Sequence, residues 1–136
     1  MISLKDITKF HGHLGPYAVL GVLMGEYALK KLKAKKYFGI EVKVWGANKK
    51  PRYCLVDGLQ LSTGATYGKN NIHKLNGFKI KVKFYNRLNG YSIVLGLRKS
   101  LIKKLQQAKT HRGAERLARE IYKTDLLNLF EQIINN

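Results

Sequence analysis

Hydrophobic residues recur with two different periods along this chain, and the two periods divide it into helices and strands. Gly15-Pro16 is typical of a helix start, because proline fits the first helical turn, and a helix is predicted from Pro16 to about Ala34. Its apolar face, at helical spacing, consists of Ala18, Val22, Gly25, Leu29 and Leu32. Gly21 and Gly25 leave a flat strip on this helix where another backbone can approach. An exposed strip would suit a dimer, and packing in the core explains it equally well.

Alternation of apolar and polar residues, which is typical of a half-buried strand, follows in several segments. It is clean over Ile40–Trp45, and over Phe78–Phe84 it places residues 78, 80, 82 and 84 on one apolar face. Asn76-Gly77 and Asn89-Gly90 are strong turn signals on either side of the second segment. The segments predicted as strands are 40–45, 71–74, 78–84 and 91–97.

Helical spacing returns in three further places. A helix is predicted over about Tyr53–Thr63 with Gly64 as its stop, another over Arg98–Lys109, and a last helical region over Ala114–Ile134, in which Thr124-Asp125 offers a second cap. The order of elements predicts an α+β domain with a small, mainly antiparallel sheet and helices on one face. At 136 residues, the chain is expected to form a single domain, 1–136.

The chain is strongly basic, and this excess of positive charge adds anionic molecules to its possible partners. Twenty-six Lys and Arg residues against eight Asp and Glu give a net charge of +18, which suits nucleic acid, an acidic protein or an anionic surface. The lysines, however, are spread over nearly every segment, as in many thermophile proteins. No nucleic-acid-binding module is recognisable. Nucleic acid is therefore an alternative partner and not the favoured one.

The presence of only one cysteine indicates in which cellular compartment the protein is expected. It excludes an intrachain disulfide and favours a reducing environment. Met1–Asp6 lacks the apolar segment of a signal peptide, and the longest apolar run, Tyr17–Met24, is too short to span a bilayer. The expected location is the cytoplasm, without membrane attachment.

Chemistry is concentrated in Phe10-His11-Gly12-His13-Leu14-Gly15-Pro16 and in the segment that begins at Cys54. If the first segment is extended, His11 and His13 point the same way and can face one ligand. Cys54 lies in the first turn of a predicted helix, where the helix dipole lowers a thiol pKa and favours the thiolate. Two imidazoles and one thiolate predict a three-ligand zinc site with an open fourth position.

Each of these residues also has a purely structural interpretation. His11 and His13 could bond to backbone at a helix start, and Cys54 could be a small buried apolar side chain. Asp57, one helical turn after Cys54 among apolar residues, needs a partner. It could orient a histidine ligand, act as a base, be a ligand, or bond to a nearby amide or lysine. Cys54 and Asp57 are the candidates for catalysis.

A loop follows the helix that carries Cys54. Gly64-Ala65-Thr66-Tyr67-Gly68-Lys69 is one residue short of a P-loop and lacks its Ser or Thr, so ATP binding is rejected. Thr66, Lys69 and Asn70 could still hold a smaller anion through backbone amides and side chains. His73 and His111 stand alone in lysine-rich segments and are expected on the surface.

Three blocks, in order, resemble the FmdE family, which takes its name from formylmethanofuran dehydrogenase. They are His11-Gly12-His13-Leu14-Gly15-Pro16, Cys54-Leu55-Val56-Asp57-Gly58-Leu59-Gln60 and Thr63-Gly64-Ala65-Thr66-Tyr67-Gly68-Lys69-Asn70-Asn71. The resemblance implies an α-β-α-β-β-β core with a mixed four-stranded sheet, C-terminal helices and often a homodimer. It also implies a pocket that retains Asp57, Thr63, Thr66 and Lys69 with altered ligands. Many members carry an additional cysteine-rich zinc-finger domain, which this chain has no cysteines to build.

The chain departs from the family pattern at two cysteine positions. Leu14 and Ala65 stand where the family usually has cysteine, so chemistry with paired thiols is excluded and a zinc site of His11, His13 and Cys54 is weakened. Three functions follow as hypotheses. The first is a zinc-binding accessory protein or small enzyme related to formylmethanofuran dehydrogenase and one-carbon metabolism. The second is a basic binding module, and the third is a metal-free member that binds a small anion.

Overall fold

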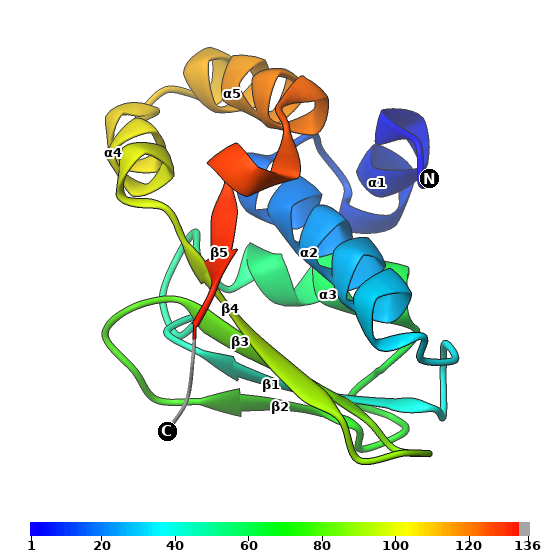
Figure 1. Cartoon of the computed structure of the whole chain (residues 1–136). Helices are drawn as coiled ribbons and strands as arrows, with labels where there is room; N and C mark the ends of the chain where they lie inside the picture. The colour runs from blue at the N-terminus through cyan, green and yellow to red at the C-terminus, as the bar shows by residue number, and fades with distance from the viewer. Residues whose placement is uncertain (134–136) are drawn as a thin grey trace.

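A computed structural model describes residues 1–133 and confirms the α+β class. No helix within residues 1–133 is both long and apolar enough to cross a bilayer. In chain order (Figure 1) the elements are α1 (Leu4–His11), α2 (Pro16–Leu32), β1 (Ile40–Trp45), α3 (Cys54–Thr63), β2 (Ile72–Leu75), β3 (Lys81–Asn86), β4 (Ser92–Leu97), α4 (Lys99–Gln107), α5 (His111–Lys123), the 3-10 turn η1 (Leu126–Asn128) and β5 (Phe130–Gln132).

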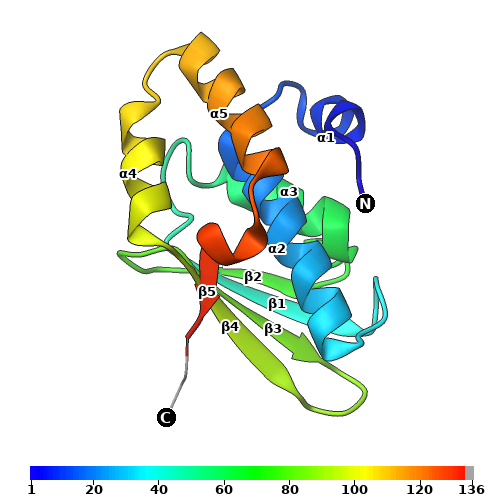
Figure 2. The same ribbon diagram turned by 45° about the horizontal axis from the view of Figure 1, so that its top comes forward.

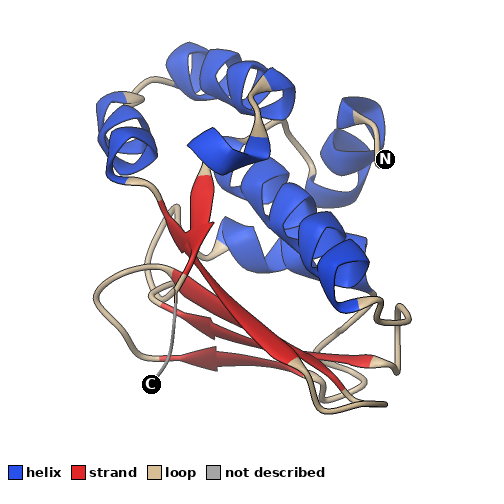
Figure 3. Cartoon of the chain, in the orientation of Figure 1, coloured by secondary structure: helices blue, strands red, loops and turns tan. Residues whose placement is uncertain are grey.

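The sheet is mixed and mainly antiparallel, as the sequence predicted. Its strands lie in the order β2-β1-β3-β4-β5, with β1 parallel to β2 and the other neighbours antiparallel. The described residues thus form five strands, where four were expected. The helices lie on one side of the sheet (Figure 3), and α2 contacts α3, α5 and the strands β3 and β4. Figure 2 shows α2 as the central helix of this layer.

Glycines set the distance between α2 and α3. A Cβ atom on Gly58 would overlap the carbonyl oxygen of Ala18 and lie 2.9 Å from the Cα atom of Gly21. A Cβ atom on Gly25 would collide with the Ser62 side chain. The two helices therefore touch backbone to backbone. The glycine strip of α2 is buried inside the domain, so it is not a surface for a dimer.

The first helix was not predicted, because α1 has only eight residues and most of them are polar. The Ser3 side chain accepts a hydrogen bond from the Asp6 amide and begins the helix, and Ile7 is its buried residue. The helix ends at Gly12, whose φ of 104° is left-handed, a conformation that glycine adopts without strain. The segment with the two histidines is consequently not extended, since His11 is helical and Gly12 turns the chain.

The strand predicted over 78–84 begins later, at Lys81. Phe78, expected on the apolar face, is 95% exposed. The Phe78 carbonyl accepts a hydrogen bond from Arg52 at 2.9 Å instead of pairing in the sheet. Strand β3 extends past Phe84 to Asn86, whose buried side chain donates to the Leu32 carbonyl. The predicted alternation is therefore correct for Ile80, Val82 and Phe84, which are buried, whereas the strand begins and ends later than predicted.

The last predicted helix divides into three elements. Helix α5 begins at His111 because the Thr110 side chain accepts from the Gly113 amide. Asp125 caps η1 through the Leu127 amide, which confirms the second cap. Strand β5 then pairs with β4 and buries Phe130. The prediction that the helical region continues through these residues was therefore wrong. The predicted end at Ile134 lies outside the described residues.

Candidate functional site

The predicted residues His11 and Asp57 are in direct contact. His11 is the last residue of α1, and Asp57 lies in the first turn of α3. The Nδ1 atom of His11 is 2.7 Å from the Oδ2 atom of Asp57. The His11 side chain is 9% exposed and the Asp57 side chain 42%, so the carboxylate reaches from the surface toward a nearly buried imidazole.

The tautomer of His11 follows from its partner. A carboxylate only accepts hydrogen bonds, so Nδ1 carries the proton and donates it to Asp57. In the neutral imidazole, Nε2 then holds a lone pair. This Nε2 atom is buried and has no hydrogen-bond partner among the described residues. An imidazole held by a carboxylate on one nitrogen, with the other nitrogen free, is the usual arrangement of a histidine metal ligand.

One further imidazole, that of His13, lies beside His11, and a third, that of His111, lies beside His13. The ring centroids of His11 and His13 are 4.7 Å apart, and those of His13 and His111 are 6.1 Å apart. The His13 ring packs over Gly15, where a Cβ atom would lie 3.1 Å from Cε1. His13 is exposed and lines a cavity of about 650 Å³ together with His111 and Glu115.

His111 was expected to be an isolated surface histidine, and sequence reasoning missed its place beside His13. The contact between His111 and His13 depends on how α5 lies against the start of α2. Neither the charge of the segment around His111 nor the spacing of its apolar residues indicates that arrangement. The only local signal was the Thr110 cap, which fixes His111 at the first position of α5.

Cys54 opens α3 and is half-buried. Burial raises the pKa of the Cys54 thiol, the negative charge of Asp57 raises it further, and Lys50 partly opposes both. The expectation of a lowered thiol pKa was therefore wrong. The amide of Cys54 already donates to the Pro51 carbonyl at 3.1 Å. Desolvation and a neighbouring carboxylate outweigh the field of the helix start.

The predicted ligand set is not assembled as a three-ligand centre. Within residues 1–133, no group of three His, Cys, Asp or Glu side chains is placed to hold a metal ion. What the structure brings together is His11, His13 and Asp57, with Cys54 close enough to Asp57 for their charges to interact. Side-chain movement of the exposed His13 would be needed to complete a site.

The residues expected to bind an anion lie in the loop after α3. Thr63 is fully buried, and its hydroxyl donates to the Leu59 carbonyl at 2.6 Å and accepts from the Ala65 amide at 3.1 Å. The Thr66 hydroxyl accepts from both the amide and the Nζ of Lys69, at 3.2 and 3.1 Å. Asn70 is exposed, with a φ of 57°. Thr63 thus completes the end of α3, and Thr66 and Lys69 bind each other.

Asn71 fixes this loop, and sequence reasoning did not single it out. Its side chain is 1% exposed. It accepts from the Thr66 amide at 2.9 Å and donates to the carbonyls of Tyr37 and Ile40 at 2.6 and 3.0 Å. Its side-chain oxygen thus closes the loop on Thr66, and its amide nitrogen joins the loop to Tyr37 and to the first residue of β1. The Asn70-Asn71 pair was the available signal, because such residues are typical of turns.

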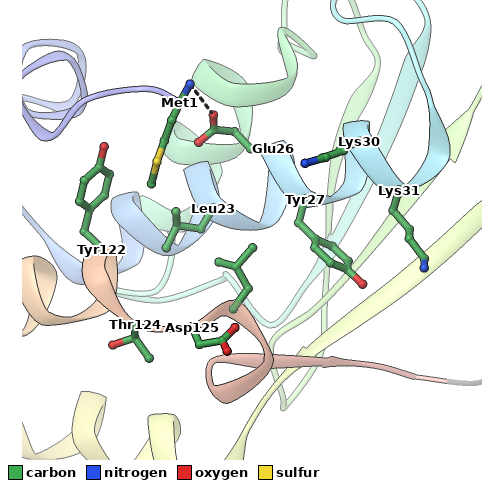
Figure 4. Close-up of a pocket in the computed structure, with 10 residues that line it drawn as sticks. Met1, Leu23, Glu26, Tyr27, Lys30, Lys31, Tyr122, Thr124 and Asp125 are labelled. Atoms are coloured by element: carbon green, nitrogen blue, oxygen red, sulfur yellow. Dashed lines mark ion pairs between the residues drawn. The ribbon is translucent and has the colours of Figure 1, made fainter.

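A further cavity lies away from these residues, between the N-terminus, α2 and the end of α5 (Figure 4). Its volume is about 670 Å³. The amino group of Met1 is 3.8 Å from Glu26 on its wall. The Tyr122 hydroxyl donates to the Ile2 carbonyl at 2.8 Å. A cavity of this size is in the range of small-molecule sites. Its lining residues are Met1, Leu23, Glu26, Tyr27, Lys30, Lys31, Tyr122, Thr124, Asp125 and Leu126.

Comparison with known proteins gives matches of three kinds. The family model described as "FmdE, Molybdenum formylmethanofuran dehydrogenase operon" matches residues 10–136. An Archaeoglobus fulgidus protein, "Probable S-adenosyl-L-methionine-binding protein", is 36% identical over 73 residues, which are 51% of this chain and 19% of that protein. The crystal structure of a tungsten formylmethanofuran dehydrogenase FmdE-like protein from Syntrophus aciditrophicus has a TM-score of 0.67 at 23% identity, over 98% of this chain and 71% of that chain.

These matches differ in how much of each protein they cover. The chain spans about a fifth of the length of the Archaeoglobus fulgidus protein, whereas the family model covers nearly the whole chain. The likeness to the solved structure is one of fold.

Proposed function

Since the chain belongs to the FmdE family, we propose that it is a zinc-binding member of it. Its role would be that of an accessory protein or a small enzyme in chemistry related to formylmethanofuran dehydrogenase. The support for this context is the family description and the name of the similar structure from Syntrophus aciditrophicus. A shared fold alone does not fix a function; the residues of the site support the assignment of zinc.

One observation carries the proposal: the Nε2 atom of His11 is buried without a partner while Asp57 holds Nδ1 at 2.7 Å. An unpaired buried nitrogen costs free energy comparable to a lost hydrogen bond. A bound cation would satisfy it. Asp57 would hold the ring in place and make it a better electron donor. His11 is thus the anchor of the proposed site.

His13 and Cys54 are the further ligands in this proposal. His13 is adjacent to His11 and exposed, so its ring is able to reorient. The raised pKa keeps the Cys54 thiol protonated at neutral pH, and metal binding would release that proton. Zinc with three protein ligands leaves one position for water or substrate, where it acts as a Lewis acid.

The two cysteine positions that this chain has lost are core positions. Leu14 is 8% exposed and Ala65 is fully buried, and both belong to the hydrophobic core. They add packing and no donor atom. A metal site in this chain would therefore depend on imidazole more than on thiolate.

Metal content tests the proposal directly. Untagged protein is reconstituted with zinc, desalted and measured by elemental analysis, beside His11→Ala, His13→Ala and Cys54→Ser variants. Near-stoichiometric zinc in the wild type and its loss in all three variants is the expected result. His73→Ala is the matched control, because His73 pairs with Glu41 on the sheet at 3.1 Å. Wild-type protein without zinc would contradict the proposal.

His111→Ala resolves the identity of the third ligand. If Cys54 is the ligand, this variant retains its zinc. Loss of zinc in His111→Ala together with retention in Cys54→Ser would assign the third position to His111, which is 6.1 Å from His13.

The cavity in Figure 4 favours a second candidate, S-adenosylmethionine binding. The partial match to the Archaeoglobus fulgidus protein suggests the ligand. The volume of about 670 Å³ is large enough for it, and the tyrosines 27 and 122 and the carboxylate of Glu26 offer stacking and polar contacts. Calorimetric titration with S-adenosylmethionine should release heat in the wild type, and none in Leu126→Trp, which fills the cavity. Absence of heat in the wild type would dismiss this candidate.

A further inference from the structure

The face of the sheet opposite the helices has a composition that the proposed zinc site does not explain. Side chains alternate across a strand, so residues between the core positions of β1 and β3 point away from the helices. The core positions are Ile40, Val42, Val44, Val82 and Phe84. The residues between them are Glu41, Lys43, Trp45, Lys81, Lys83 and Tyr85. In Figure 3, no helix of the described chain covers this face.

The register of the strands arranges these residues in rows. Lys43 lies between Lys83 of β3 and His73 of β2. In the next row Trp45 lies opposite Lys81, whose Nζ is 4.7 Å from the centroid of the Trp45 ring. On the other side of Lys43, Glu41 lies opposite Tyr85. A basic row is thus flanked by two rows that each hold an aromatic ring. We call these six residues of β1 and β3, with His73, the open sheet face.

The pairing of Lys43 with Lys83 is unfavourable by itself, because like charges directly opposite each other destabilise a sheet. The carboxylate of Glu41 is engaged by His73 at 3.1 Å. A shallow cavity of about 310 Å³ lies between these side chains and is lined by Glu41, Lys43, Lys83 and Tyr85. An anion placed between the two lysines would relieve their repulsion.

The sequence shows that this charge is not local. Residues 58–114, which include β2, β3 and β4, contain twelve Lys and Arg residues and no Asp or Glu. Most of the eight acidic residues lie in or next to the helices instead. Within this segment, Lys74 of β2 and Lys81 and Lys83 of β3 have no acidic neighbour along the chain. An excess of positive charge attracts a polyanion and steers its approach.

We propose that the open sheet face binds single-stranded nucleic acid. Lys43, Lys83 and Lys81 would contact phosphates, and unpaired bases would stack on Trp45 and Tyr85, which is 39% exposed. Basic grooves with aromatic side chains are the recurrent way in which proteins hold single strands. A second copy of this chain is a poorer occupant, because it would bring two lysine rows together. An acidic polypeptide would use the lysines and leave the aromatic rings without a role.

Fluorescence anisotropy with a labelled oligouridylate and a labelled oligothymidylate tests the proposal. We expect binding that weakens steeply with salt. The double variant K43E/K83E should bind at least about tenfold more weakly than the wild type, since each lost phosphate contact reduces affinity. The matched control is K103E/K109E, which makes the same change of charge on and just after α4. A loss as large in the control as in K43E/K83E would overturn the proposal.

The aromatic residues separate this proposal from simple attraction between charges. Trp45→Ala and Tyr85→Ala should each weaken binding by about tenfold, because each removes a ring on which a base would stack. Circular dichroism and thermal unfolding verify that each variant is folded. A matched duplex and polyglutamate should bind more weakly than the single strands. Equal binding of polyglutamate together with unchanged affinity of Trp45→Ala would overturn the proposal in favour of an acidic protein partner.

The zinc site and the open sheet face are independent. His13→Ala and Cys54→Ser should bind the oligonucleotides as the wild type does. Stronger binding of either the RNA or the DNA oligomer would identify the preferred strand and support the proposal in both cases. Absence of binding to both oligomers at low salt would contradict it, whatever the zinc content.

Discussion

The Nδ1 atom of His11 lies 2.7 Å from a carboxylate oxygen of Asp57, 46 residues further along the chain. This hydrogen bond joins the end of α1 to the first turn of α3. It leaves the second nitrogen of His11 buried and unpartnered among the described residues. His11 and Asp57 come from the two segments in which the sequence concentrates its candidate chemistry. Their contact shows that the fold brings these two segments together.

The Asp57→Asn variant should lower zinc affinity by about 10–100-fold, the usual effect of removing the carboxylate partner of a histidine ligand. Asparagine preserves the size of the side chain, so the fold should persist. Competition with a chromophoric chelator measures the affinity. Glu41→Gln is the control, because it removes the other His–carboxylate pair and should have no effect. Equal affinities for all three proteins would contradict the role of Asp57.

Alkylation of Cys54 by iodoacetamide should require a higher pH than alkylation of free cysteine, because burial and Asp57 raise the pKa of the thiol. A raised pKa means that the folded chain holds this proton more firmly than the unfolded chain. The associated stability is present below the ordinary pKa of the thiol and is lost as the pH rises through the raised value. Rates across alkaline pH give the midpoint.

The same experiment has an internal control. Asp57→Asn removes the second cause of the shift, so its midpoint should move toward that of free cysteine. A wild-type midpoint at or below that of free cysteine would show that the helix field dominates after all.

Gly58→Ala should destabilise the domain by at least about 2 kcal/mol, because overpacking a close contact costs about 1–3 kcal/mol or more. Its Cβ atom would meet the backbone of Ala18 and Gly21, and backbone cannot rotate away. Urea unfolding measures the loss. Gly68→Ala is the matched control, since the nearest atom to its Cβ is the Thr66 hydroxyl at 4.0 Å. Similar stabilities for the two variants would refute the glycine contact.

Asn71→Ala should cost about 2–3 kcal/mol of stability, because it leaves buried hydrogen-bonding groups of the backbone without partners. Those groups are the Thr66 amide and the carbonyls of Tyr37 and Ile40. Thermal unfolding reports the change. The neighbouring Asn70→Gly should be neutral or slightly stabilising, because residue 70 has a φ of 57° that glycine adopts freely.

Local pattern predicted the elements whose cause is local. Pro16 and the apolar face that follows it predicted α2 correctly. Strict alternation predicted β1 with the bounds that the structure has, Ile40–Trp45. The Asp57 carboxylate was expected to need a partner, and orientation of a histidine was one of the options. Phe78 shows the limit of the same rule: it was expected on the apolar face but is 95% exposed. Its carbonyl accepts from Arg52, and the strand begins later, at Lys81.

Other features depend on contacts between distant segments. His111 lies beside His13 because α5 crosses the start of α2, and no spacing in the sequence encodes that crossing. Strand β5 exists because the free edge of β4 offers hydrogen bonds to Phe130–Gln132, whereas the segment has the spacing of a helix. The raised pKa of Cys54 likewise required the burial of the thiol and the position of Asp57.

The hydrogen bond from the Tyr122 hydroxyl to the Ile2 carbonyl spans 120 residues. It fastens the start of α1, the helix that carries His11 at its other end, to the end of α5. During synthesis the first helix therefore emerges from the ribosome long before the residue that secures it. Helix α1 is held at both ends, by α5 at its start and by Asp57 of α3 at its end. The position of His11 therefore depends on residues of α5 as well as on its own partner Asp57.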